Sequence, residues 1–196
     1  MANPYAIWNT SRNDTAKFRG TADPLPSIYG ALPFPSPSLN PSPFMTFAFT
    51  DFKPSIVNCT ILGPNNSPQF RVVTDSAMPG YTILKMMNGK NSAMIEWQEP
   101  AKVEVRGMIS KQRASDFLKI PFDRRYRIMV IRSKEYIWIP NGNTISLYTA
   151  SSGILGRISR SVRAITLEMS QHAIRAGLLQ ACIITTILLQ SREIID

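Results

Sequence analysis

The chain has 196 residues, of which 44% are hydrophobic and 18% are charged, and its mean hydropathy is −0.07. This size and composition suffice to bury a sizeable core, and one compact domain with a tail accounts for the length. Lysine and arginine outnumber aspartate and glutamate by 22 to 13, a formal charge of +9 that favours an anionic partner. The chain has no apolar run of about 18 residues, which argues against a conventional membrane-spanning helix.

The two cysteines, Cys59 and Cys182, are too few for a disulfide-built secreted scaffold. The first residues lack the basic and apolar regions of a secretory signal. We therefore expect a cytoplasmic protein in which both cysteines are buried free thiols.

The beginning of the chain is rich in proline. Eight of the 15 prolines lie within the first 44 residues, and residues 32–43 read LPFPSPSLNPSP. Proline lacks a backbone donor and favours extended conformation, so we predict an irregular leader over residues 1–43 and a single folded domain over residues 44–196. The leader is either a surface linker or a docking segment for a proline-binding groove.

After the leader, short apolar or alternating runs separated by turn residues predict a series of β-strands. They cover residues 46–50, 55–62, 69–74, 81–87, 92–98, 102–109, 126–132, 135–139, 144–148, 155–159 and 164–168. Turn signals at residues 88–89, 132–134, 141–142 and 151–153 predict hairpins. Residues 114–119 are expected to add a short helical turn. The regular spacing favours an antiparallel meander closed into a barrel or sandwich.

The last element predicted is a helix over residues 171–190, with Ser170 as its N-cap. Residues 176–189 carry no charge and are apolar on every side, as expected of a helix surrounded by protein. At about 1.5 Å per residue this part spans roughly 21 Å, short of the ~30 Å hydrocarbon core of a bilayer. A buried central helix is therefore favoured over a membrane anchor, although four consecutive β-branched residues leave a partial strand open.

Five segments carry a resemblance to a known family: AMIEWQ (93–98), KVEVRG (102–107), DRRY (123–126), KEYIWI (134–139) and IITTILL (183–189). In order and spacing, residues 44–191 resemble an uncharacterised family of domains of unknown function, abundant in mushroom-forming fungi. That family is similar to tubby-like and phospholipid-scramblase-like domains. The resemblance implies a mainly β fold, a closed antiparallel β barrel around a buried hydrophobic C-terminal helix. Some tubby-like domains bind phosphoinositides through surface lysines and arginines, but none of their binding residues is carried over to a numbered position here.

Most of the net charge lies in residues 102–134, which hold ten basic and three acidic side chains. If strands 102–109 and 126–132 pair, several of the cations share an outer face. The candidates for binding an anion or a lipid are Lys102, Arg106, Lys111, Arg113, Arg124, Arg125, Arg127, Arg132 and Lys134. The alternative is a solvated exterior with local ion pairs, in which Glu96, Glu99, Glu104 and Asp123 take part.

The inventory of catalytic residue types is poor. His172 is the only histidine, and one histidine with two distant cysteines forms no zinc pattern. Phosphate-binding glycine loops are absent from the sequence, so we expect no catalytic residues, no metal and no cofactor. A site assembled across strands stays open, with Glu96, Glu104, Lys102, Tyr126 and His172 as its candidate members. The aromatic residues Trp97, Tyr126, Tyr136 and Trp138 are expected to pack in the barrel rather than stack on bases.

Two function hypotheses remain. The first is a non-enzymatic protein that associates with anionic phospholipid or phosphoinositide surfaces through its basic face. The second is a protein-interaction module that uses the Pro-rich leader or a barrel edge. We expect no nucleic-acid partner, because no zinc spacing, helix-turn-helix or RNP signature accompanies the charge.

Overall fold

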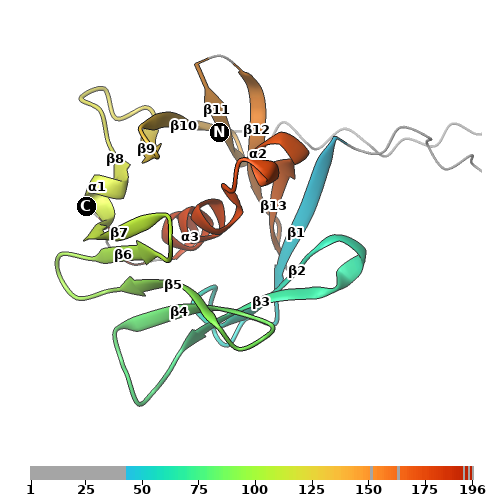
Figure 1. The fold of residues 1–196 in the computed structure, drawn as a ribbon, viewed down its shortest axis with the longest axis vertical. Coiled ribbons are helices and arrows are strands. Elements are labelled where there is room, and N and C mark those ends of the chain that lie inside the picture. Colours follow the sequence, from blue (N-terminus) through green and yellow to red (C-terminus); the bar gives the residue numbers. More distant parts are fainter. Residues whose placement is uncertain (1–42, 151, 163, 192, 194, 196) are drawn as a thin grey trace, which may run out of the picture. The chain divides into compact units, whose positions relative to one another are not determined.

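The structure is a computed structural model that describes residues 43–150, 152–162, 164–191, 193 and 195 (Figure 1). The predicted Pro-rich leader therefore lies, except for Pro43, outside the described residues, and so does Ser151 of one predicted hairpin. Within the described part, thirteen antiparallel strands form one sheet. Along the sheet their order is β7-β6-β5-β4-β3-β2-β1-β13-β12-β11-β10-β9-β8.

Most strand connections are short, as expected of a meander. The strands are β1 (Phe44–Thr50), β2 (Cys59–Leu62), β3 (Pro68–Thr74), β4 (Tyr81–Met86), β5 (Asn91–Glu96), β6 (Lys102–Val105), β7 (Ile109–Arg113), β8 (Leu118–Lys119), β9 (Arg127–Ile131), β10 (Lys134–Asn141), β11 (Thr144–Thr149), β12 (Ser152–Arg160) and β13 (Ile165–Ser170). The helices are η1 (Pro64–Asn66), α1 (Ala114–Phe117), α2 (Gln171–Arg175) and α3 (Leu179–Gln190).

Side-chain alternation explains why these segments form strands with one face toward the core. In β13, every second residue is buried, and Leu167 lies opposite Phe47 of β1, which is also buried. The turn signals are confirmed where the backbone needs a positive φ. Gly89 (φ 81°) ends the turn between β4 and β5, and Gly142 (φ 56°) lies between β10 and β11.

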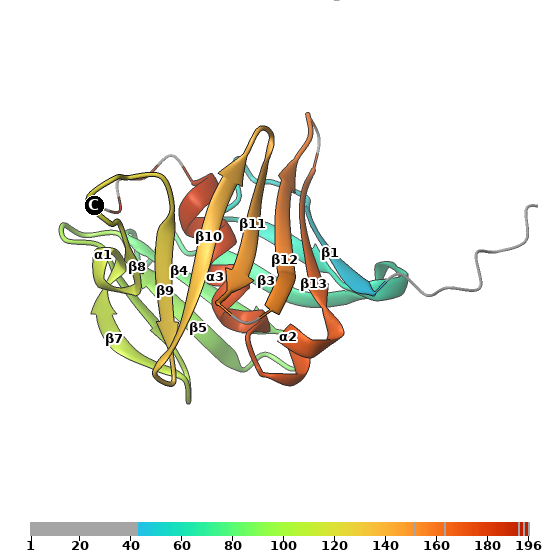
Figure 2. The ribbon, with the colours of Figure 1, turned by 90° about the horizontal axis from the view of Figure 1, so that it is seen from above.

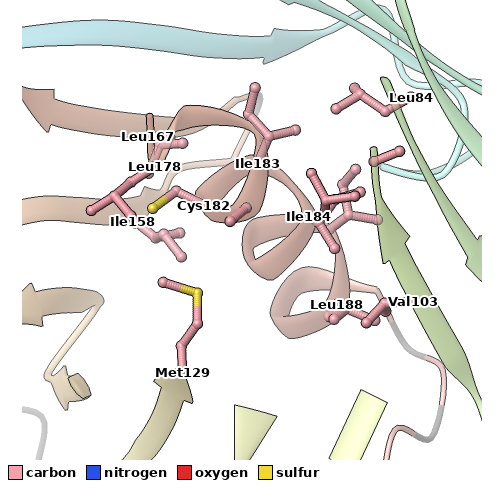
Figure 3. Close-up of a cluster of buried hydrophobic side chains, with 14 of the residues drawn as sticks. Leu84, Val103, Met129, Ile158, Leu167, Leu178, Cys182, Ile183, Ile184 and Leu188 are labelled. Atoms are coloured by element: carbon pink, nitrogen blue, oxygen red, sulfur yellow. The ribbon is translucent and has the colours of Figure 1, made fainter. Parts of the chain in front are cut away.

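The sheet curls around α3, which runs through its middle (Figures 1 and 2). Every residue from Ala181 to Leu188 is buried, which confirms the predicted central helix. Apolar side chains converge on α3 from distant strands, as Figure 3 shows for Leu84, Val103, Met129, Ile158 and Leu167. The hydroxyl of Thr186 donates to the Cys182 carbonyl at 2.8 Å, so this buried polar group is satisfied within the helix. Cys59 and Cys182 are both buried and free, as expected.

The single helix predicted over residues 171–190 is wrong in one respect, because it is broken into α2 and α3. Ser170 caps α2 as expected, accepting from the Ala173 amide at 3.2 Å. Gly177 then takes a φ of 80° and ends α2. The Leu178 amide donates to the Ala173 carbonyl at 3.1 Å and the Gly177 amide to the Ile174 carbonyl at 2.9 Å, which is a Schellman motif.

The predicted strand over residues 102–109 is confirmed only in its first half. Gly107, with a φ of 71°, makes a turn there, so the segment contains β6 and only the first residue of β7. The conditional pairing of this segment with residues 126–132 does not occur. Instead, β6 pairs with β5 and β7, while β9 pairs with β8 and β10. The two segments therefore do not form a hydrogen-bonded pair of strands.

The two edge strands of the sheet are β7 and β8, and α1 connects them. This short helix contacts both edges and buries Ala114 and Phe117. The helical turn expected over residues 114–119 is confirmed for residues 114–117, whereas residues 118–119 form β8. The strand pairings of the described residues do not show the sheet closed by hydrogen bonds.

Because neighbouring strands are antiparallel, their connections alternate between the two ends of the sheet. We call the end where α3 finishes the helix-exit end. It carries the connections 51–58, 120–126, 142–143 and 161–164. The opposite end, where α3 begins, is the helix-entry end and carries α2 with the turns 106–108 and 132–133 (Figure 2). Within the described chain, no helix reaches the length and apolarity that a membrane crossing needs.

Candidate functional site

The structure divides the nine candidate cations among three places. Lys102, Lys111 and Arg113 lie on β6 and β7, and Arg124, Arg125 and Arg127 lie in or directly after the connection between β8 and β9. Arg106, Arg132 and Lys134 lie at the helix-entry end. The strand pairing that was expected to place several of these cations side by side does not occur, because β6 pairs with β5 and β7 while β9 pairs with β8 and β10.

Two lysines of the first group lie beside a buried carboxylate. The Glu96 side chain is only 7% exposed, and Lys111 Nζ lies 2.6 Å from its Oε2 while Lys102 Nζ lies 3.9 Å from its Oε1. Strand register brings the two lysines to Glu96. Glu96 on β5 lies opposite Lys102 on β6, and Lys102 lies opposite Arg113 on β7. Lys111 is two residues before Arg113 in β7 and therefore lies on the same face of the strand. The hydrogen bond from Lys111, together with the charge of Lys102, holds the pKa of Glu96 below its usual range. Two of the nine candidates are thus engaged in the local ion pairs that were the alternative hypothesis.

The second group belongs to a loop at the helix-exit end. We call residues 120–126, between β8 and β9, the arginine loop. The Phe122 side chain at its tip is fully exposed, and Arg124 and Arg125 beside it are exposed as well. The Arg124 amide donates to the Pro121 carbonyl at 3.0 Å, and the Arg125 amide to Asp123 Oδ1 at 3.3 Å. These bonds give the loop a defined shape that presents an aromatic ring next to two guanidinium groups.

The base of the arginine loop is held by the neighbouring strands. Arg127 Nη1 donates to the Leu118 carbonyl at 3.2 Å, which ties the start of β9 to β8. Beneath the loop lies a hollow of about 140 Å³, whose lining includes Arg124, Arg125, Tyr126 and Leu189 of α3. The arginine loop therefore lies next to the C-terminal end of the buried helix α3.

A second apolar tip lies at the same end of the sheet. Val162, in the turn between β12 and β13, is fully exposed, and Arg160 beside it is exposed. Both residues line hollows that reach Gln190 at the end of α3, and one of these hollows shares Ile145 with the hollow beneath the arginine loop. Sequence reasoning did not single out Phe122 or Val162. The sequence did contain a signal for Phe122. It lies between Pro121 and Asp123, outside any predicted strand, so no alternating strand pattern would direct its ring into the core.

The third group is dispersed. Arg132 takes a φ of 50° in the turn between β9 and β10, Lys134 begins β10, and Arg106 follows β6. All three side chains are exposed. Arg106 lines a small hollow of about 90 Å³ together with Glu104.

The five residues considered for a site assembled across strands are not brought together. Glu96 and Lys102 form one ion pair, Tyr126 lies at the helix-exit end and His172 lies at the helix-entry end. Three of the four aromatic residues pack as expected: Tyr136 and Trp138 are buried, and Trp97, which packs against the core, donates from Nε1 to the Thr82 hydroxyl at 2.7 Å. Tyr126 instead lies half-buried in the arginine loop. Burial raises the pKa of the Cys59 thiol to about 12 and also raises that of Cys182, so both thiols stay protonated near neutral pH.

These features define a mainly β protein, a 13-stranded antiparallel sheet with a buried C-terminal helix. The chain belongs to the family of unknown function DUF6593, whose model matches residues 54–193, from before β2 to after α3. No curated protein matches the chain. A solved structure of a protein from Arabidopsis thaliana, AT5G01750, is similar with a TM-score of 0.44 and 12% sequence identity, over 72% of this chain and 88% of the plant chain.

Proposed function

We propose that the protein is a non-enzymatic, cytoplasmic domain that associates reversibly with anionic phospholipid surfaces through the arginine loop. The observation that carries the proposal is the fully exposed Phe122 next to the exposed Arg124 and Arg125. Water disfavours an exposed aromatic ring, whereas the headgroup region of a bilayer accepts both the ring and the neighbouring cations.

The expected energies favour this arrangement over charge alone. A lysine or arginine near an anionic leaflet contributes about 1 kcal/mol, and burial of a phenylalanine side chain contributes about 1.5–3 kcal/mol. Val162 and Arg160 add a second apolar and cationic pair at the same end. Lys102 and Lys111 are left out of this surface, because Glu96 neutralises part of their charge.

The resemblance to tubby-like domains supports the same proposal, since some of these domains bind phosphoinositides through surface lysines and arginines. It also supports a closed form of the sheet. We infer that α1 completes the barrel by packing its buried Phe117 between the edges β7 and β8. A closed, rigid sheet would hold the loops of the helix-exit end in a fixed arrangement.

Vesicle co-sedimentation tests the lipid proposal. We expect the full chain to bind phosphatidylcholine vesicles that contain phosphatidylserine or a phosphoinositide, and to release them as salt rises, since salt screens exposed charges. The double variant R124E/R125E should lose at least about tenfold in affinity, which corresponds to 1.4 kcal/mol. Phe122→Ser should weaken binding and leave its salt dependence intact.

The matched control reverses two exposed cations elsewhere. The variant K90E/R106E changes the net charge by the same amount as R124E/R125E, and both residues lie in turns at the helix-entry end. It should retain most of the binding. Equal losses in the two double variants would overturn the assignment to the arginine loop. Absence of binding at low salt would overturn lipid association altogether, and loss of partner capture on deleting residues 1–43 would then favour the protein-interaction hypothesis.

A further inference from the structure

A hollow of about 430 Å³ opens at the helix-entry end, the opposite end from the arginine loop. Its walls come from β10, β11 and β12 on one side and from the junction between α2 and α3 on the other. The side chains that matter for its chemistry are Lys134, Tyr136, Thr149, Leu155, His172 and Leu178. Two of these residues were predicted to belong to a site: Lys134 to the anion- or lipid-binding face, and His172 to a site assembled across strands.

The break between the two helices explains why the hollow is open. The Schellman motif at Gly177 turns α2 away from the axis of α3, and α2 then packs on β12 and β13. The inner side of the sheet next to β10 and β11 is left uncovered at this end. A continuous helix over residues 171–190 would instead have run straight out of the sheet.

Three polar side chains face this hollow from the inner side of the sheet. Lys134 and Tyr136 have the same strand parity as the buried Trp138, so they project inward at the rim of β10. The Thr149 hydroxyl is shielded from solvent and has no hydrogen-bond partner among the described residues. A buried hydroxyl without a partner is costly, and a bound polar group would remove that cost.

The rim has one lysine and one carboxylate, Lys134 and Glu135, while His172 is formally neutral at pH 7. Of the two charged side chains, only Lys134 has the inward strand parity of Tyr136 and Trp138. Lys134 takes part in no ion pair within the described chain, and His172 lies across the hollow on α2. Burial raises the pKa of Tyr136, so its hydroxyl remains a hydrogen-bond donor. An anion is therefore the charge type that these donors complement.

The floor of the hollow is apolar, since Leu155 and Leu178 are both buried and Ala176 forms part of the wall. We propose that this hollow binds a small apolar molecule that carries one carboxylate. The apolar part lies on Leu155 and Leu178, and the carboxylate accepts hydrogen bonds from Lys134 and from the hydroxyls of Tyr136 and Thr149. A concave, largely apolar site with a few converging polar groups is the usual form of a ligand pocket.

Calorimetric titration of the full chain with octanoate, without vesicles, tests this proposal. Octanol and octylammonium serve as the neutral and cationic probes of the same chain length. We expect saturable, one-to-one binding of octanoate at least about tenfold tighter than that of octanol, the equivalent of 1.4 kcal/mol for the contacts to the carboxylate. Equal affinity for octanoate and octanol, tighter binding of octylammonium, or no saturable octanoate binding would each overturn the proposal.

Two kinds of variant locate the site. Ala176→Trp fills the exposed side of the hollow and should abolish octanoate binding, with Ala150→Trp as the second variant if the first unfolds. Lys134→Ala should remove the preference for octanoate over octanol, whereas Lys119→Ala, an exposed lysine of β8, should not. Unchanged octanoate binding in folded Ala176→Trp and Ala150→Trp would overturn the location. None of these results depends on whether the arginine loop binds lipid.

Discussion

Glu96 is a carboxylate whose surroundings compensate for its burial. Its side chain is shielded on the outer face of β5, and two lysines from β6 and β7 approach its two oxygens. Removing one partner from such a cluster leaves a poorly solvated charge, so the cluster acts as a unit. Its charges are consequently less available to a distant anion than those of the arginine loop.

The lowered pKa of Glu96 predicts a pH effect on stability. A carboxylate with a lowered pKa in the folded state stabilises the fold above its ordinary pKa of about 4.3, and this contribution is lost as pH falls through the lowered value. Thermal unfolding between about pH 7 and pH 3 should therefore show a smaller acid-induced loss in Glu96→Gln than in the parent chain. Glu99→Gln, in an exposed loop, should keep the parent's dependence, and parallel curves for Glu96→Gln and the parent would contradict the prediction.

At the scale of the elements, Gly177 separates the two helices. A Cβ added there would meet only Met108 Cε, at 4.0 Å, so space does not restrict the position. Its φ of 80° does, because a residue with a Cβ is disfavoured in this region. The glycine is thus required by backbone conformation rather than by packing.

We predict that Gly177→Ala lowers the free energy of unfolding by about 1–2 kcal/mol, the cost of the left-handed conformation for a residue with a Cβ. Gly177→Asn should lose less, because asparagine tolerates this conformation better. Urea denaturation measures both. Gly153→Ala is the control, since Gly153 has open space and no positive φ, and it should change stability by no more than about 0.5 kcal/mol. A Gly177→Ala chain as stable as the parent would contradict the prediction.

The strands show where sequence patterns succeed and where they fail. Most were predicted within a few residues because alternation and turn residues are local signals. The strand predicted over residues 102–109 was too long for a physical reason. Apolar residues occur on both sides of the turn at Gly107, so the hydrophobic pattern does not mark the end of β6. The break at Gly177 was missed because helix-forming residues surround the glycine on both sides.

At the scale of the whole molecule, α1 joins the two edges of the sheet. Phe117 is buried in this short helix, which contacts β6, β7, β8 and β9. An unpaired edge is prone to association with other strands, and a covering helix is one way to protect it. The packing of Phe117 is therefore expected to stabilise both edges together.

Phe117→Ala should lower the free energy of unfolding by about 3–5 kcal/mol, as expected for a buried aromatic residue. It should also speed amide hydrogen exchange in both β7 and β8. The matched control is Phe122→Ala, a fully exposed phenylalanine, whose effect on stability should stay within about 0.5 kcal/mol. Faster exchange in β8 alone would show that α1 does not couple the two edges.

The spacing of residues was sufficient to predict a mainly β domain, most of its strands, the Ser170 cap and the burial of the helix within residues 171–190. Those features depend on local periodicity, on capping and on the absence of charge, all of which are visible in a short window of sequence. The distribution of the nine cations required the folded chain. Whether a lysine meets Glu96 or solvent depends on strand order and register, which are set by contacts between residues far apart in the sequence. For the same reason, the exposure of Phe122 and the hollow behind Lys134 became apparent only once the sheet had curled around α3.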